Sequence, residues 1–156
     1  MNQKLTKLLE EINRPDPRTI NTNIDIDPKI KQFIKIINKS NGIYTLYSCQ
    51  GHIRKYKNKT RFETPYIVWI VKKNKINIFL NELIKIIPLE KQIKQNPMFL
   101  FSNSYNTNIE FDYHNKDFQI ITTRFDKKCI DNQTFYNNLE NMAKKLYKIT
   151  NRKNNK

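Results

Sequence analysis

The segment at residues 66–72 constrains the fold of this chain more than any other. Its centre, Ile67–Val71, is an unbroken apolar run of β-branched and aromatic residues, which favours a β-strand. A strand that is apolar on both faces lies in the middle of a sheet, because both faces must be covered. The run is too short to cross a bilayer. The sequence therefore predicts a sheet with this segment as its central strand.

Hydrophobic periodicity predicts the remaining elements. Apolar residues recur at helical spacing over residues 5–12, 30–37, 79–87 and 135–146. Further strands are expected at 43–48, 98–102, 108–113 and 118–124, with a hairpin turn at 114–117. Asp27 is expected to cap the second helix, whose first turn contains Pro28. Loops are expected at 89–97 and, with strongly basic composition, at 52–61.

The order of these elements is ααββαβββα. This order predicts an α+β fold with helices packed on a mixed or antiparallel sheet. Neither an internal repeat nor a shift in composition divides the chain. We therefore expect a single α+β domain over residues 1–150, followed by a basic disordered tail at residues 151–156.

Positive charge dominates the composition. The 156 residues include 29 Lys and Arg against 14 Asp and Glu, which gives a formal net charge of +15. Hydrophobic residues at 38% and aromatic residues at 12% exclude a simple basic tail. The chain is also rich in Ile, Asn and Lys, whose codons are AT-rich, so part of the lysine excess reflects codon usage. The arginines are not explained in this way, and they favour a polyanionic partner.

The N-terminus and the cysteines indicate an intracellular protein. Residues 1–12 contain acids where a signal peptide would be apolar. Two cysteines, Cys49 and Cys129, are too few for a disulfide framework. We expect a cytoplasmic protein in a reducing compartment, with no membrane partner, and the sequence is compatible with a homo-oligomer.

The turn after the first expected strand is the first candidate site. Gly51 is one of only 2 glycines, and glycine at a strand end often lets the backbone approach a ligand closely. Ser48, Gln50 and the N–H groups near Gly51 are expected to form an anion-binding nest. A β-bulge or a simple turn is the alternative interpretation of the same residues.

Cys49 and His52 in this turn suggest two kinds of chemistry. They can act as nucleophile and base, but the sequence identifies no third group to orient the base. They can also bind a metal, but their spacing to His114 and Cys129 matches no zinc signature. We therefore assign no catalytic residue and expect no metal site. A buried packing role is the simpler interpretation of Cys49.

A basic segment with interleaved aromatic residues follows the turn. Arg54 and Arg61 offer bidentate contacts to phosphate, and a solvated hairpin loop is the alternative interpretation. Arg124 ends a strand, where it can reach the same phosphate or pair with a nearby aspartate. The aromatic residues expected to stack on a base are Tyr47, Tyr66 and Trp69, although a core position is the simpler interpretation of the tryptophan.

Several of these residues form a pattern that resembles the tRNA wybutosine-synthesizing protein 3 family. The matching residues are Asp27-x-x-Ile30, Ile36-Ile37-Asn38, Tyr44-Thr45, Ser48-Cys49-x-Gly51-x-Ile53, Trp69 and Thr122-Thr123-Arg124. The Ser-Cys-x-Gly core is the specific part, and this chain has His52 where the family has arginine. The resemblance implies the family's α+β fold and a ligand cleft at residues 48–51. The family's activity is an S-adenosylmethionine-dependent methylation of a modified tRNA guanosine.

Three alternative functions follow. The leading hypothesis is a small basic intracellular protein that binds a phosphate-bearing ligand, a nucleotide or RNA, in a cleft at Ser48–His52. The second is an S-adenosylmethionine-dependent tRNA-modifying enzyme, and it alone requires that cofactor. The third is an inhibitor or sponge of viral or mobile-element origin, which sequesters a host nucleotide signal or blocks a host nucleic-acid-binding protein.

Overall fold

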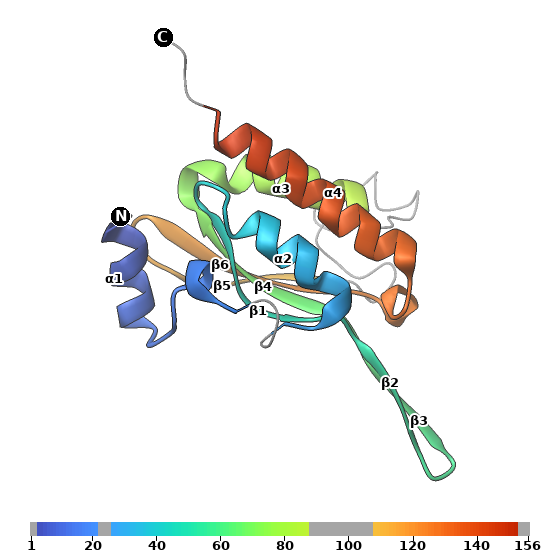
Figure 1. The fold of residues 1–156 in the computed structure, drawn as a ribbon. Coiled ribbons are helices and arrows are strands. Elements are labelled where there is room, and N and C mark those ends of the chain that lie inside the picture. The colour runs from blue at the N-terminus through green and yellow to red at the C-terminus, as the bar shows by residue number, and fades with distance from the viewer. Residues whose placement is uncertain (1–2, 22–25, 88–107, 153–156) are drawn as a thin grey trace, which may run out of the picture.

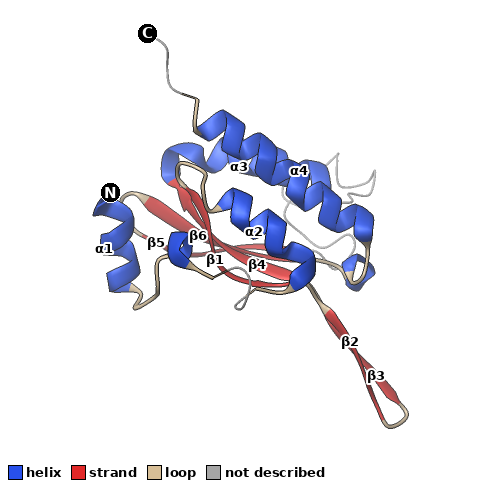
Figure 2. Ribbon diagram, in the orientation of Figure 1, coloured by secondary structure: helices blue, strands red, loops and turns tan. Residues whose placement is uncertain are grey.

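The predicted central strand is β4 (Tyr66–Lys72), which lies between β1 (Ile43–Cys49) and β6 (Phe118–Arg124). A fourth strand, β5 (Asn108–His114), pairs with β6, so the spatial order is β1-β4-β6-β5. All of these pairings are antiparallel. The computed structural model describes residues 3–21, 26–87 and 108–152. The predicted α+β class is therefore confirmed (Figures 1 and 2).

One face of the sheet is covered by α2 (Lys31–Ile37), α3 (Ile76–Ile86) and α4 (Gln133–Thr150), as Figure 2 shows. Alternate residues of a strand point to the same face, so Ile67, Trp69 and Val71 of β4 all enter the apolar cluster beneath these helices. This cluster is the main core of the protein.

The opposite face carries α1 (Gln3–Glu11). The buried leucines of α1 pack against Ile70 of β4 and Phe118 of β6 in a second, smaller cluster. The apolar run of β4 thus contributes side chains to both layers, which is why it is apolar on both faces.

Trp69 is fully buried in the main core. Its ring makes edge contacts with Phe33 and Phe79, at centroid distances of 5.6 and 4.9 Å. Its indole Nε1–H donates a hydrogen bond of 3.0 Å to the Thr123 hydroxyl on β6. The core interpretation of Trp69 is confirmed, and the expectation that it stacks on a ligand is wrong.

The segment expected to be a basic loop is a β-hairpin. The strands β2 (His52–Tyr56) and β3 (Lys59–Glu63) form a separate two-stranded sheet, joined by a turn in which Lys57 has φ +52°. We call residues 52–63 the β-arm, and Figure 1 shows it projecting from the body of the protein. Most of its side chains are exposed, so these strands lack the apolar alternation by which a strand is recognised.

The second helix also differs from expectation. It begins as a 3-10 turn, η2 (Pro28–Ile30), and continues as α2. Asp27 occupies the N-cap position, but its side chain makes no capping hydrogen bond. The carboxylate instead accepts a hydrogen bond from the Gln50 N–H, so the expected capping role of Asp27 is wrong.

Some predicted elements lie outside the described residues: the strand at 98–102, the loop at 89–97 and the tail beyond residue 152. Asn151, the first residue of the expected tail, donates its side-chain amide to the Lys39 carbonyl at 2.9 Å. The chain is therefore still held against the body at that point. Within the described ranges, none of the helices has both the length and the apolar character needed to span a bilayer.

Replacing Thr123 with valine should lower the free energy of unfolding by about 1–3 kcal/mol. Valine keeps the shape of threonine but removes the acceptor, so the Trp69 N–H stays buried without a partner. Thr60, exposed on the β-arm, is the matched control, and Thr60→Val should change stability by less than about 0.5 kcal/mol. Urea denaturation measures both. Equal changes in the free energy of unfolding would contradict a stabilising role of the buried hydrogen bond.

Candidate functional site

Gly51 forms the sharp turn between β1 and the β-arm. Its φ is +85°, and a Cβ at this position would lie 2.8 Å from Pro65 and 2.9 Å from Ile130. Glycine is therefore required here both by conformation and by space. The expectation that the backbone requires glycine at position 51 is confirmed. The groups packed against Gly51, however, are the protein's own side chains rather than an open ligand cavity.

Gln50, which precedes Gly51 in the turn, makes three hydrogen bonds. Its N–H donates to Asp27 Oδ2 at 3.0 Å, and its side-chain Oε1 accepts from the Lys29 N–H at 3.0 Å. Its carbonyl accepts from the Tyr136 hydroxyl of α4 at 2.8 Å. The expected anion nest thus already holds an anion of the protein itself, the Asp27 carboxylate. A phosphate at the same N–H would be repelled by that carboxylate.

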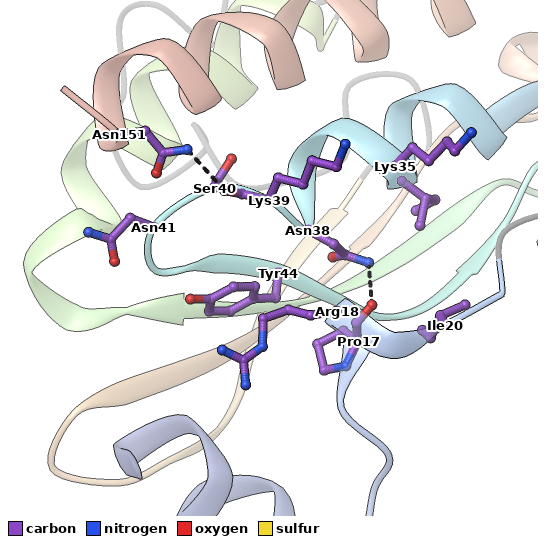
Figure 3. A pocket seen from close by; sticks show the side chains of 11 residues that line it. Pro17, Arg18, Ile20, Lys35, Asn38, Lys39, Ser40, Asn41, Tyr44 and Asn151 are labelled. Carbon is purple, nitrogen blue, oxygen red and sulfur yellow. Dashed lines mark hydrogen bonds between the residues drawn. The ribbon is translucent and has the colours of Figure 1, made fainter. Parts of the chain in front are cut away.

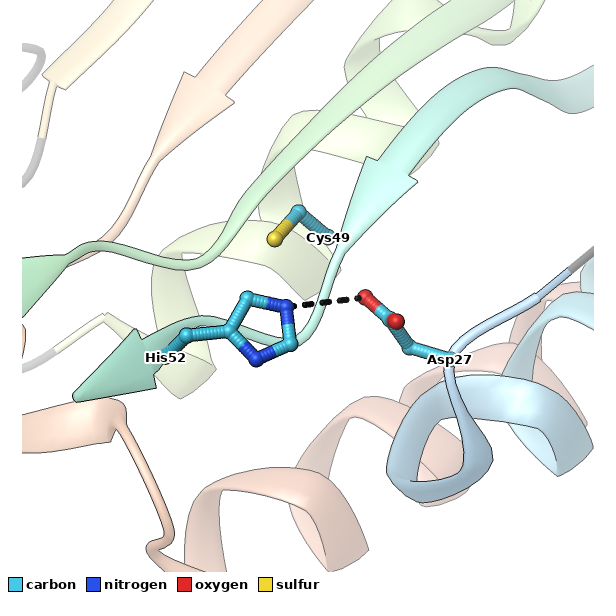
Figure 4. A group of neighbouring side chains, drawn as sticks. All are labelled: Asp27, Cys49 and His52. Atoms are coloured by element: carbon cyan, nitrogen blue, oxygen red, sulfur yellow. Dashed lines mark ion pairs between the residues drawn. The ribbon is translucent and has the colours of Figure 1, made fainter. Parts of the chain in front are cut away.

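Asp27, Cys49 and His52 lie together at this turn (Figure 4). The His52 Nε2 is 3.8 Å from Asp27 Oδ2, and the Gly51 N–H donates to the Cys49 sulfur at 3.4 Å. Cys49 was singled out with His52 from the sequence, whereas Asp27 was interpreted only as a cap. One sequence feature connects Asp27 with Cys49: both belong to the pattern that resembles the wybutosine-synthesizing protein 3 family.

Neither cysteine is an activated nucleophile. Burial raises the pKa of the Cys49 thiol more than the hydrogen bond from the Gly51 N–H lowers it, and the carboxylates of Asp27 and Glu63 raise this pKa further. Burial likewise raises the pKa of Cys129 to about 11. Both thiols are therefore protonated at neutral pH, and the thiolate is the nucleophilic form. Neither environment lowers the thiol pKa, as an activated cysteine nucleophile requires.

The β-arm carries a concentrated positive charge. Its cations are Arg54, Lys55, Lys57, Lys59 and Arg61. Arg54 and Arg61 are direct cross-strand partners, and the next pair on the same face is Tyr56 with Lys59. Glu63, the only acid in the arm, accepts a hydrogen bond from Arg54 Nε at 2.9 Å. Like charges directly opposite each other destabilise a strand pair, so this face is suited to an external anion.

Exposed aromatic rings alternate with these cations. Tyr56 near the tip of the arm is 75% exposed and Phe62 is 45% exposed. At the root of the arm, the Lys127 ammonium lies 5.1 Å from the Phe62 ring centre. The Arg124 guanidinium lies 5.8 Å from the ring of Tyr66. One face of the arm therefore carries Tyr56 with Arg54, Lys59 and Arg61, whereas Phe62 pairs with Ile53 on the other face.

The strand register brings several predicted site residues to this root. Cys49, Tyr66 and Arg124 are successive cross-strand partners on β1, β4 and β6. Tyr47 is 39% exposed, but the Arg14 guanidinium covers its ring at 4.8 Å. The described residues therefore place most of the predicted site at the root of the arm or on the arm itself.

The predicted cleft at residues 48–52 is small. A hollow of about 260 Å³ touches Tyr47 and Ser48, and the rest of its lining is apolar or uncharged. A larger hollow of about 640 Å³ lies away from the turn, beside Tyr44, and is lined by Arg18, Lys35 and Lys39 (Figure 3). The charge needed to bind a phosphate is therefore on the arm and in this second hollow rather than in the cleft at the turn.

Tyr136→Phe should lower the free energy of unfolding by about 1–2 kcal/mol. Phenylalanine removes the hydroxyl that donates to the Gln50 carbonyl and accepts from the Asp131 N–H. Tyr147 on the same helix is 42% exposed and serves as the control, because Tyr147→Phe changes the same atom at the surface. Thermal and chemical denaturation compare the two. If the two variants are equally stable, α4 does not hold the turn.

No protein-family model and no curated protein matches the chain. Among solved structures, it is similar to the structure of PH1069 protein from Pyrococcus horikoshii. The two are 12% identical, with a TM-score of 0.38 and coverage of 96% of this chain and 91% of the other. A similarity this weak carries no argument about function. The resemblance to the wybutosine-synthesizing protein 3 family stays a prediction, and function has to be argued from the site itself.

Proposed function

We propose that this protein binds single-stranded RNA along the β-arm and across the strand ends at its root. The observation that carries the proposal is the cross-strand pair of Arg54 and Arg61 on a hairpin that packs on no core. The two arginines are directly opposite each other on neighbouring strands, where like charges repel, and the Arg54–Glu63 ion pair offsets part of that repulsion. A phosphate bound at this pair would add charge-assisted contacts to the guanidinium groups. The bound anion stabilises the arm as well as the complex.

The aromatic residues favour nucleic acid over a simple inorganic anion. Tyr56 exposes its ring on the face that carries Arg54 and Arg61, Phe62 exposes its ring on the opposite face, and bases of a single strand stack on such rings. The deep, narrow major groove of duplex RNA does not admit side chains, so an unpaired strand suits this surface better. The backbone would follow the cations while individual bases stack on the rings. These features support a ligand on the arm rather than in the turn.

A second candidate function is nucleotide binding in the hollow of about 640 Å³ shown in Figure 3. One observation favours it: the buried Ser40 hydroxyl in its wall has no hydrogen-bond partner among the described residues. Lys35 and Lys39 from the same wall would supply positive charge for a phosphate. A mononucleotide displaces few counterions, so its binding would depend only weakly on salt.

Salt dependence tests the role of the arm. For a single strand, the slope of log affinity against log salt is about −0.7 per phosphate contact. The triple variant K57Q/K59Q/R61Q should therefore make the slope shallower by about 2 and weaken binding of an unstructured RNA oligonucleotide. Fluorescence anisotropy over a range of salt concentrations measures both quantities.

The matched control is K73Q/K116Q/K148Q, which changes the net charge equally at exposed positions. Residues 73 and 116 lie next to the end of the sheet at which Lys72 pairs with Phe118, opposite the root of the arm. Equal losses of affinity in the two triple variants would contradict an arm-specific interface. If the protein binds S-adenosylmethionine and does not bind the RNA oligonucleotide, the result would favour the enzymatic alternative instead.

Tyr56→Ala should weaken RNA binding by about 1–3 kcal/mol, the usual cost of losing one stacked base. Tyr56 is 75% exposed and contributes no core packing, so the fold should be unaffected. Tyr147→Ala, which removes a partly exposed ring from α4, is the control and should bind RNA normally. An unchanged dissociation constant for Tyr56→Ala would show that the arm contacts phosphates alone.

A further inference from the structure

We infer that Asp27, Cys49 and His52 form a binding site for a zinc ion at the root of the β-arm. A carboxylate oxygen, a sulfur and an imidazole nitrogen, one from each residue, lie within 4.8 Å of one another. Figure 4 shows the three side chains converging from the loop before η2 and from both sides of the turn. The inference does not rest on the proposed function.

The donor set identifies the metal. Zinc is bound by thiolate, imidazole and carboxylate, whereas magnesium and calcium take oxygen ligands almost exclusively. Zinc–ligand bonds of about 2.0–2.3 Å in a tetrahedron place neighbouring donor atoms roughly 3.3–3.7 Å apart. The 3.8 Å between His52 Nε2 and Asp27 Oδ2 is close to that separation. A small closing movement of the Cys49 side chain would complete the three-ligand arrangement.

The backbone that carries the ligands is fixed by contacts of its own. Asp27 Oδ2 accepts the Gln50 N–H at 3.0 Å, which orients the carboxylate as a second-shell hydrogen bond does in known metal sites. Gln50 and Gly51 lie between Cys49 and His52 in the chain, and there is no room for a side chain at Gly51. The Tyr136 hydroxyl holds the Gln50 carbonyl at 2.8 Å, so the turn is tied to α4 as well.

The three ligands are partly exposed, so a fourth coordination position is open to solvent. Glu63 is the cross-strand partner of His52 in the arm, but its carboxylate already accepts a hydrogen bond from Arg54, so we expect a water molecule at the fourth position. Binding by sulfur displaces the thiol proton to solvent, and the ion then joins the loop at Asp27 to the first residue of the arm.

Metal titration of the reduced, chelator-stripped full chain tests the inference. Zinc competition with a chromophoric chelator should give one equivalent bound, and magnesium should not compete. Cobalt should produce a thiolate-to-metal charge-transfer band together with the intense visible absorption of tetrahedral cobalt. Cys49→Ser should abolish the charge-transfer band, whereas Cys129→Ser, which removes the other thiol, should retain it.

The two remaining ligands have their own variants. His52→Gln and Asp27→Asn should each weaken zinc binding by at least about tenfold, the loss that a single second-shell partner typically causes. Asparagine keeps an oxygen that can accept the Gln50 N–H, so Asp27→Asn should stay folded. His114→Gln is the histidine control and should bind zinc normally. Zinc should also raise the melting temperature of the unaltered protein but not that of His52→Gln.

Two results would overturn the site. One is the absence of a charge-transfer band at a saturating cobalt concentration. The other is a band that persists in Cys49→Ser and is lost in Cys129→Ser, which would place the thiolate elsewhere. RNA binding measured without metal is a separate readout, so failure of the zinc site and failure of the RNA interface are distinguishable.

Discussion

The hydrogen bond between the Asp27 carboxylate and the Gln50 N–H holds together the part of the molecule that carries the candidate sites. It joins the loop before η2 to the turn after β1, and the Tyr136 hydroxyl then joins the same turn to α4. The β-arm begins two residues beyond Gln50, so its direction depends on how that residue is held. Gly51 lets the chain bend away from the sheet, because glycine adopts the left-handed φ and leaves room for the side chains of Pro65 and Ile130.

The arm and its root differ in how they are stabilised. The root is held by partly buried hydrogen bonds to Asp27 and to Tyr136 of the main core, whereas an isolated two-stranded hairpin is only marginally stable in water. Its directly opposed arginines disfavour the strand pair, and the Arg54–Glu63 ion pair offsets part of that repulsion. The attachment at its root orders the arm, and the proposed RNA ligand would stabilise it further.

Burial determined how much could be predicted from the sequence. The strands at 66–72 and 118–124 were predicted with correct bounds because their side chains enter the core, and α1 and α4 were located from their apolar faces. The sequence predicts a loop for the β-arm, because its mostly exposed side chains show no apolar alternation. The sequence also singles out Cys49, Gly51, His52 and the arginines of the arm, and the structure places all of them at the turn after β1 or on the arm.

Tertiary contacts account for what the sequence did not predict. The sequence around Asp27 is typical of a helix cap, because capping depends on neighbouring residues only. The actual partner of its carboxylate, the Gln50 N–H, lies 23 positions along the chain and leaves no local signal. The expected anion nest was filled by that carboxylate, which nothing in the local pattern indicates. Trp69 was offered as a stacking residue, but its burial depends on Phe33, Phe79 and Thr123 from three other elements.

The central claim is that RNA is bound on the β-arm, and chemical-shift mapping tests it most directly. Titrating the isotopically labelled protein with a short unstructured RNA should shift the amide signals of residues 52–63, together with those of Tyr66 and Arg124 at the root. Shifts confined to the hollow lined by Arg18, Lys35 and Lys39 would contradict the claim and place the ligand there instead.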